Sequence, residues 1–488
     1  MNYFILGAGL ALLGVAHAGH EFPFYPSFYP QEITVEALDA SAAAQRLAQG
    51  TLHAYAGELA EQSAGAKLGS VASLGGYVVA TFEPNASHAA RCAAARGMKD
   101  ALPAGAVWHP YPVTPFHADY LHHADRGEAA RAARPAQKIE GTKLEVIGVG
   151  ALVRGAGVRY NGGSGPPWAR QGWFHAYLLL APAVKDARIE EAARRLMRGD
   201  YRSLEERITL ERNLVELLQE GCERVVLGYT VRREPYGADY SQGVENVGYD
   251  ALEGLASPIF PRTVKLRDFP WNGWLNVAAP QPPSSAWNPV VGGFGDAFGR
   301  LVWAALADSA FLPSPHGDGW IENRVSASVE RSEKPFAVPE DALFSVAGSK
   351  TARLRIVYRV RNSAFHDGTP MSVADSLYAY AFAAHPDVAQ ATALARERLK
   401  GVRPLRVETE TLAFGEDKLT YEVPVIEVYL DSSRDDAAAI APPWSTLRAT
   451  CSARRSTVFS PRSLPRSPRP CFGRRRPPAA PPGCRSRK

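Results

Sequence analysis

Residues 353–381 place a strand, a turn and a helix in direct succession, so this part of the chain must fold as a sheet covered by a helix. In residues 353–360, RLRIVYRV, apolar side chains alternate with arginines, as in a strand with one buried face. The Asp-Gly pair at 367–368 then indicates a turn. Ser372, with Asp375 three residues later, is typical of a helix N-terminus.

Charge is divided unevenly along the chain. The 488 residues include 55 Lys and Arg against 50 Asp and Glu, a net charge of +5. Residues 447–488 contain 12 of the basic residues and no acid, so the remainder has 43 basic against 50 acidic residues, a net charge of −7. A basic total suggests nucleic acid or an anionic membrane as partner. Because the body of the chain is acidic, we expect no nucleic-acid partner.

Residues 447–488 are rich in Arg, Pro and Ser and have no hydrophobic period of strand or helix, so they cannot bury a face. One interpretation is a basic arm. The interpretation we favour is translation in a shifted reading frame, because GC-rich codons read out of register yield Arg, Pro, Ser, Ala, Gly and Cys in excess. We expect a disordered tail without function.

The first eighteen residues have the pattern of a secretory signal peptide. Residues 4–15 form an apolar run that is too short to span a bilayer comfortably but suits the hydrophobic region of a signal. Ala16 and Ala18 supply the small side chains that precede cleavage at Gly19. We therefore expect a cleaved signal peptide over residues 1–18 and a periplasmic mature protein.

Residues 19–266 have the pattern of a mixed α/β or α+β domain, with no family indicated by the sequence. We expect, in chain order, helix 35–47, strand 76–82, helix 89–101, strands 144–153 and 172–180, a helix that begins after Ser203, and strand 223–232. Ser203 and Glu206 have the spacing of a capping box, which supports the position of the last helix.

Cys92 and Cys222 are the two cysteines outside the basic tail. In an oxidising compartment they could form a disulfide, but their spacing matches no redox or zinc-ligand motif. The interpretation we favour is two unrelated buried thiols.

Residues 103–135 form a loop rich in His, Pro and Tyr. Four histidines and two aspartates of this loop lie within 17 residues: His109, His117, Asp119, His122, His123 and Asp125. Such side chains can bind metal ions, but their spacing matches no helical His pair or other known ligand pattern. We favour a solvated aromatic loop. A periplasmic metal-binding protein that uses the loop His109–His123 is the alternative.

Residues 354–380, LRIVYRVRNSAFHDGTPMSVADSLYAY, resemble the signature region of family 5 extracellular solute-binding proteins, the peptide/nickel-type receptors of ABC importers. Upstream, residues 275–278 resemble the first strand of that family, residues 286–289 its early turn, and residues 298–306 the helix that follows. The resemblance covers residues 267–446. It implies an α/β fold in which this region is an incomplete first lobe of a two-lobed periplasmic binding protein.

The resemblance implies the substrate-binding component of an ABC transporter, which closes on a ligand and presents it to a permease in the inner membrane. Family ligands include oligopeptides, nickel or haem complexes and some sugars. The predicted ligand-binding residues are Trp287, Asn288 and Trp303. No nucleophile elbow, HExxH motif or Ser-His-Asp order stands out, so we expect no enzyme activity, no catalytic residue, no metal ligand and no cofactor.

The resembling region, 180 residues long, is too short for both lobes of a receptor. We therefore expect the chain as written to be truncated and inactive in transport. A third hypothesis is a periplasmic scaffold whose 19–266 domain binds another protein.

Overall fold

The structure is a computed structural model in which helices and strands are mixed, which confirms the α/β class at the coarse level. It describes residues 30, 32–59, 67–83, 85–132, 139, 141–156, 167–268, 273–283, 296–306, 310–346, 348, 350–362, 370–383, 398–414 and 417–432. The predicted signal peptide and the basic tail lie outside the described residues.

The strands are β1 (Glu32–Ala37), β2 (Ala54–Tyr55), β3 (Leu68–Thr81), β4 (Ala106–Trp108), β5 (Lys143–Gly148), β6 (Arg224–Gly237), β7 (Val244–Glu245), β8 (Lys265–Leu266), β9 (Trp274–Ala279), β10 (Phe311–Pro313), β11 (Trp320–Glu322), β12 (Val325–Ala337), β13 (Thr351–Val360), β14 (Leu399–Phe414) and β15 (Asp417–Leu430).

The α-helices are α2 (Ala40–Ala48), α3 (His88–Ala95), α4 (Ala124–Arg131), α5 (Val149–Gly155), α6 (Gly172–Leu180), α7 (Ala187–Arg198), α8 (Leu204–Glu220), α9 (Phe260–Thr263), α10 (Ala297–Leu306) and α11 (Val373–Ala383). Short 3₁₀ helices are η1 (Met98–Ala101), η2 (Tyr120–His122), η3 (Pro167–Arg170) and η4 (Ala181–Ala183). None of the described helices has the length and hydrophobicity needed to cross a membrane.

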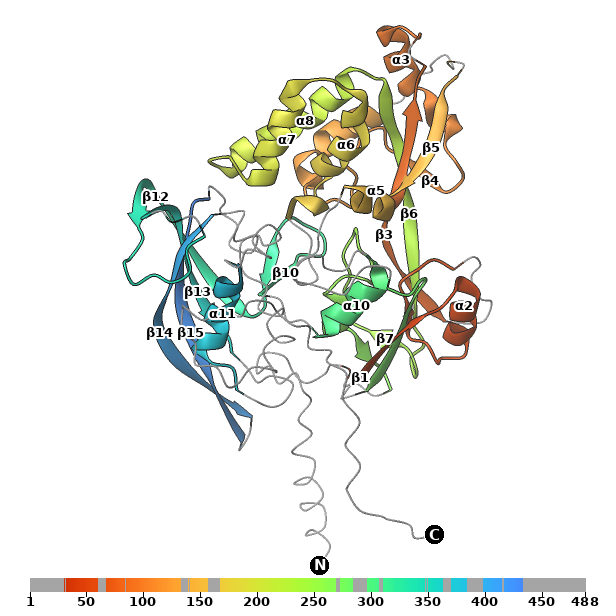
Figure 1. Ribbon diagram of the computed structural model, residues 1–488. Helices are drawn as coiled ribbons and strands as arrows, with labels where there is room; N and C mark the ends of the chain where they lie inside the picture. The colour runs from red at the N-terminus through yellow and green to blue at the C-terminus, as the bar shows by residue number, and fades with distance from the viewer. Residues whose placement is uncertain are drawn as a thin grey trace, which may run out of the picture.

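A seven-stranded mixed sheet runs through the first half of the chain, with the order β1-β9-β2-β6-β3-β5 and with β4 paired to β6 (Figure 1). The long antiparallel pair β3 and β6 forms its centre. Strand β9 is parallel to both β1 and β2. This sheet therefore extends past residue 266, where the sequence placed a domain boundary.

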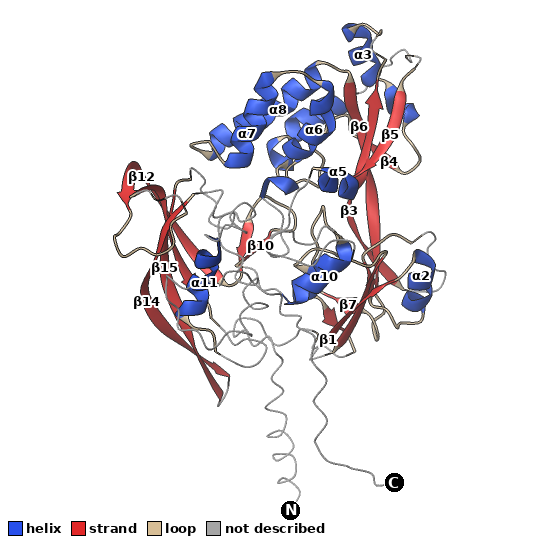
Figure 2. Ribbon diagram, in the orientation of Figure 1, coloured by secondary structure: helices blue, strands red, loops and turns tan. Residues whose placement is uncertain are grey.

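Helices α5 to α8 lie on one face of the long strands (Figure 2). Tyr77 and Val79 of β3 belong to the main core, which these helices cover. The alternate residues Val78 and Ala80 belong to a smaller core on the other face, with Ala94 of α3. The period of two along β3 thus separates two cores, as expected for a strand buried on both faces.

Helices α7 and α8 form an antiparallel hairpin whose ends are specified by local sequence. Gly199 ends α7 with a left-handed backbone (φ 67°), which glycine adopts without a Cβ clash. Ser203 then begins α8, and its hydroxyl accepts a 3.1 Å hydrogen bond from the Glu206 amide, so the predicted cap is confirmed. The inner face of α8 carries Glu211, Leu214, Val215 and Leu218, all of which are buried.

Strands β12 to β15 form a second sheet in the order β12-β13-β15-β14. The prediction for residues 353–360 is confirmed, since Leu354, Ile356, Tyr358 and Val360 of β13 are buried. Helix α11 packs on this sheet, as predicted. Figure 1 shows β10 and α10 between the two sheets.

Three predicted elements of the first half differ from the structure. Residues 172–180 form helix α6 and not a strand. This segment is apolar and buried on nearly all sides, so its sequence has no period that separates helix from strand. Residues 35–47 contain the end of β1 and then α2, and residues 144–153 contain β5 and then α5. The predicted strands 76–82 and 223–232 are confirmed, and the predicted helix 89–101 contains α3 followed by η1.

Cys92 and Cys222 form a disulfide, so the interpretation as unrelated thiols is wrong. Pairing of Thr81 with Arg224 brings the end of β3 next to the start of β6. Because Cys92 lies shortly after β3 and Cys222 just before β6, their Cα atoms are 5.2 Å apart despite 130 residues between them. This proximity depends on sheet pairing, which the spacing of the cysteines does not encode.

Candidate metal centre

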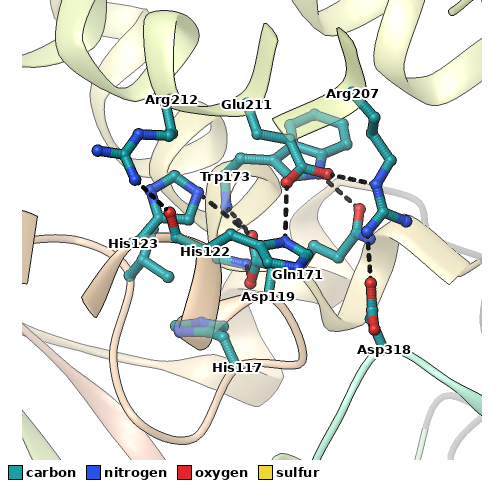
Figure 3. A network of polar contacts seen from close by, with 12 residues as sticks. His117, Asp119, His122, His123, Gln171, Trp173, Arg207, Glu211, Arg212 and Asp318 are labelled. Atoms are coloured by element: carbon teal, nitrogen blue, oxygen red, sulfur yellow. Dashed lines mark hydrogen bonds and ion pairs between the residues drawn. The ribbon is translucent and has the colours of Figure 1, made fainter. Parts of the chain in front are cut away.

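Three buried side chains from separate parts of the first half meet beneath helix α8 (Figure 3). Asp119 and His123 come from the loop that joins β4 to α4, and Glu211 comes from α8. All three have 0% exposure. One ligand atom of each lies within 4.8 Å of the others.

Asp119 is fixed by the start of α6. Its Oδ1 accepts a 2.6 Å hydrogen bond from the Gly172 amide, and its Oδ2 accepts a 3.3 Å bond from the Trp173 amide. A carboxylate at a helix N-terminus is stabilised by these free amides. Burial is nevertheless the larger influence and, with the negative charge of Glu211, raises the pKa of Asp119 to about 7.

His123 is oriented by Tyr111, whose hydroxyl lies 2.8 Å from Nδ1. When Nδ1 donates its proton to this hydroxyl, the lone pair of Nε2 faces Asp119 Oδ2 at 3.9 Å. A hydrogen bond from the second ring nitrogen is the usual support of a metal-binding histidine. Burial, followed by the charge of Arg212, lowers the pKa of His123 to about 3, so the ring is neutral at physiological pH.

Glu211 projects from the apolar face of α8 into the same space. Its Oε1 lies 3.4 Å from Nε of Arg207, and its Oε2 lies 3.7 Å from Nδ1 of His122. The carboxylate of Glu211 raises the pKa of His122. Within the described part of the chain, neither oxygen of Glu211 has a hydrogen-bond partner, and neither has Nε2 of His123.

Unpaired buried polar atoms are costly, and each such atom in a folded protein requires a physical explanation. Here the unpaired atoms are carboxylate oxygens and an imidazole nitrogen that converge, which is the donor set of Zn²⁺, Mn²⁺ or Fe²⁺ sites. Bonds of about 2.0–2.2 Å to a common ion place its ligands roughly 3–4 Å apart, so small rotations would close this site. Asp119, His123 and Glu211 therefore fit a divalent transition metal, with His122 adjacent as a further donor.

The histidines that the sequence places in one loop lie in different environments in the structure. His123, with His122 beside it, lies at the cluster. His109 hydrogen-bonds to the Val113 carbonyl at 2.8 Å. Asp125 forms an exposed ion pair with Arg212. The prediction of a solvated loop is thus wrong for His109, His117 and His123, because these three side chains are buried.

His117 belongs to a second buried network with Tyr77 and His175. The Thr114 amide donates to His117 Nδ1, so the proton of His117 is on Nε2, 2.7 Å from the Tyr77 hydroxyl. That hydroxyl is also 2.7 Å from His175 Nδ1, and His175 Nε2 donates to the Ala169 carbonyl. Every side-chain polar atom of His117, Tyr77 and His175 has a partner. We therefore assign the network a structural role.

The described residues contain one further group of possible ligands, His88 with Cys92 and Cys222. Its two sulfur atoms are bonded to each other, so they are not free to bind a metal.

No family model, curated protein or solved structure matches this chain. The geometry described above is therefore the basis for assigning a function.

The ligand-binding residues predicted from the resemblance lie elsewhere. Trp287 and Asn288 are outside the described residues. Trp303 lies in α10 with 1% exposure. The structure does not bring Trp303 to the cluster, and the roles of these three residues remain predictions.

Sequence reasoning missed Glu211, although the helix pattern contains a signal. Glu211 shares the inner face of α8 with Leu214, Val215 and Leu218, at the spacing of an amphipathic helix. An acid at a core position of such a helix is expected to be paired or to bind a metal.

Proposed function

We propose that this protein is an exported binding protein that holds a divalent transition-metal ion at Asp119, His123 and Glu211. The observation that carries the proposal is the convergence of three completely buried side chains. Both oxygens of Glu211 and Nε2 of His123 have no hydrogen-bond partner among the described residues. The metal favoured by two carboxylates and an imidazole, without a thiolate, is Zn²⁺, Mn²⁺ or Fe²⁺. The alternative of a metal-binding loop is therefore adopted, with Glu211 as an additional ligand.

Charge supports a cation at this position. Asp119 and Glu211 contribute two carboxyl groups, whereas Arg207, which lies 3.4 Å from Glu211, is shared with Asp318. Arg212 is engaged by Asp125. A divalent ion would neutralise both buried carboxylates, displace the proton that the raised pKa of Asp119 favours, and bind the neutral His123.

Isothermal titration of chelator-treated protein with Zn²⁺ and Mn²⁺ tests this proposal. We expect one binding event per chain, weakened at least tenfold in Glu211→Gln and His123→Gln, since loss of a ligand removes a metal bond. Glu216→Gln, which changes an exposed acid on the same helix (54% exposed side chain), is the matched control. Equal binding by Glu211→Gln and Glu216→Gln would refute the site.

The second candidate function is the substrate-binding component of an ABC transporter. The specific observation in its favour is that, along the chain, β13 precedes and α11 follows the FHDGTP segment, which is the order that the resemblance implies. On this proposal, residues 267–446 form part of the first lobe of a two-lobed periplasmic receptor, which binds a peptide or small molecule and contacts an inner-membrane permease. Both candidate functions are binding functions and require no catalytic residue.

Ligand-induced thermal stabilisation with a panel of oligopeptides tests the receptor proposal. Trp287→Ala should abolish any stabilisation. Trp274→Ala is the control, because Trp274 is 69% exposed on β9. A peptide that stabilises both variants equally would show that Trp287 does not belong to the binding site.

Fractionation of cells with N-terminal sequencing tests export, for which the expected mature protein begins at Gly19.

A further inference from the structure

We propose that Arg207 competes with the metal for Glu211, and that Asp318 controls the metal affinity by holding Arg207 away from the site. This inference rests on the proposed metal-binding function. It assigns an affinity-determining role to two residues that do not bind the metal.

Arg207 lies between two acids, as Figure 3 shows. Its Nε is 3.4 Å from Glu211 Oε1 but forms no hydrogen bond with that oxygen, whereas its Nη2 donates to Asp318 Oδ2 in a close contact. The Arg207 side chain is 16% exposed and that of Asp318 is 33% exposed. The guanidinium therefore donates a hydrogen bond to Asp318, whereas its contact with Glu211 is an ion pair without a hydrogen bond.

Asp318 belongs to the turn between β10 and β11, 111 residues after Arg207. Other contacts hold this turn against the first half of the chain. Arg170 donates to the Ser314 carbonyl and forms a 2.6 Å ion pair with Asp250. The Ala251 amide donates to the Pro315 carbonyl at 3.2 Å. The position of Asp318, and hence of Arg207, thus depends on docking of the β10–β11 hairpin.

Electrostatics gives the direction of the effect. A metal–oxygen bond of about 2.0–2.2 Å would place the ion nearer to Glu211 than Arg207 now is. The ion and the guanidinium repel each other and satisfy the same carboxylate, so a full Arg207–Glu211 pair disfavours metal binding. A contact between Arg207 and Asp318 disfavours that pair and therefore favours the metal.

The coupling must be reciprocal, because it is a free energy shared by two equilibria. If docking of the hairpin raises metal affinity, metal binding must stabilise the docked hairpin to the same extent. The structure thus connects the buried site to a contact between the two halves of the chain.

Titration of the full chain with Zn²⁺ tests the inference, with Asp318→Asn, Arg207→Gln and the double variant measured beside wild type. We expect Asp318→Asn to weaken Zn²⁺ binding about tenfold, because Arg207 then pairs with Glu211. Arg207→Gln should bind Zn²⁺ more tightly, and adding Asp318→Asn to it should change nothing further. Glu216→Gln is the control: it removes an exposed acid of α8 whose partner is Arg126, and we expect less than a twofold effect.

Several outcomes would overturn the inference, and they differ from failure of the metal site itself. If wild type binds no Zn²⁺, the proposed function fails. If wild type binds Zn²⁺ but Asp318→Asn equals Glu216→Gln, or weakens binding equally with and without Arg207, the competition mechanism is wrong. Hydrogen exchange gives a second measurement: Zn²⁺ should slow exchange at residues 314–322 in wild type but not in Arg207→Gln. Equal slowing in both proteins contradicts the coupling.

Discussion

Oδ2 of Asp119 lies 3.9 Å from Nε2 of His123, and both side chains are completely buried. This distance exceeds a hydrogen bond, so the acid and the base face each other without satisfying each other. Both oxygens of Asp119 accept hydrogen bonds from backbone amides of α6, but Nε2 of His123 is buried without a partner among the described residues, which costs stability unless a third group joins it. In the function that we propose, a metal ion with Glu211 as its third protein ligand would provide that group.

Glu211→Gln should stabilise the metal-free protein. In the presence of a chelator, the wild-type carboxylate is buried without a hydrogen bond, and removing its charge should raise the free energy of unfolding by about 1–2 kcal/mol. Urea denaturation in EDTA measures this difference, with Glu216→Gln as the control. A loss of several kcal/mol would instead show that the pair with Arg207 is a structural ion pair.

His175 should make stability depend on pH below neutrality. Burial lowers the pKa of His175 to about 4, whereas the unfolded side chain titrates near 6.5. The unfolded state therefore binds more protons between these values, so stability is fully present above about pH 6.5 and falls as the pH decreases toward 4. The expected loss from His175 is on the order of 2–3 kcal/mol.

The difference in unfolding free energy between wild type and His175→Gln isolates this effect. The raised pKa of Asp119 acts in the opposite direction in the same pH range and cancels in the difference. The wild-type curve should be steeper than that of His175→Gln, and His316→Gln, an exposed control, should follow wild type. Parallel curves for His175→Gln and wild type would contradict a neutral buried His175.

The disulfide between Cys92 and Cys222 should be a major source of stability for the first sheet. It closes a loop of 130 residues, which corresponds to about 4–5 kcal/mol in the loop-entropy model. The double variant Cys92→Ser/Cys222→Ser should therefore unfold at lower urea, and reduction should destabilise wild type but not this variant. Thiol titration of the unfolded oxidised protein should detect neither cysteine as free.

The cap of α11 should contribute about 1 kcal/mol to the second sheet and its helix. Asp375 Oδ2 accepts 2.8 Å hydrogen bonds from both the amide and the hydroxyl of Ser372. The acid, and not the serine as predicted, thus provides the principal acceptor. Asp375→Ala should lower the free energy of unfolding by about 1 kcal/mol. Ser372→Ala should lower it by less, because the hydrogen bond from the backbone amide of residue 372 to Asp375 remains. A larger effect of Ser372→Ala would reverse this assignment.

Local sequence patterns correctly predicted the helices and strands that have one apolar face and one polar face. Strand β13 has strict alternation, and α8 has a cap and an apolar stripe, so both were predicted correctly. Helix α6 is buried on most sides, and its sequence therefore lacks the contrast on which a periodicity argument depends. The disulfide was missed for a different reason, since it requires the pairing of β3 with β6.

The candidate site was predictable only in part. The loop from His109 to His123 was identified from its composition, and it supplies Asp119 and His123. The division of its histidines was not predictable, because it depends on contacts with Tyr77, His175 and α8, which are distant in sequence. Glu211, 88 residues beyond His123, is brought to the site by packing of α8 against α6. A histidine-rich loop can therefore predict a site without predicting all of its ligands.

Metal analysis of the purified protein tests directly whether Asp119, His123 and Glu211 hold a metal ion. Wild type and Glu211→Gln are stripped with a chelator, equilibrated with Zn²⁺, desalted and measured by mass spectrometry of the metal. We expect about one zinc ion per folded wild-type chain and a small fraction of that in Glu211→Gln, with Glu216→Gln equal to wild type. Folded wild-type protein that retains no zinc, or equal zinc content in all three proteins, would contradict the proposed metal site.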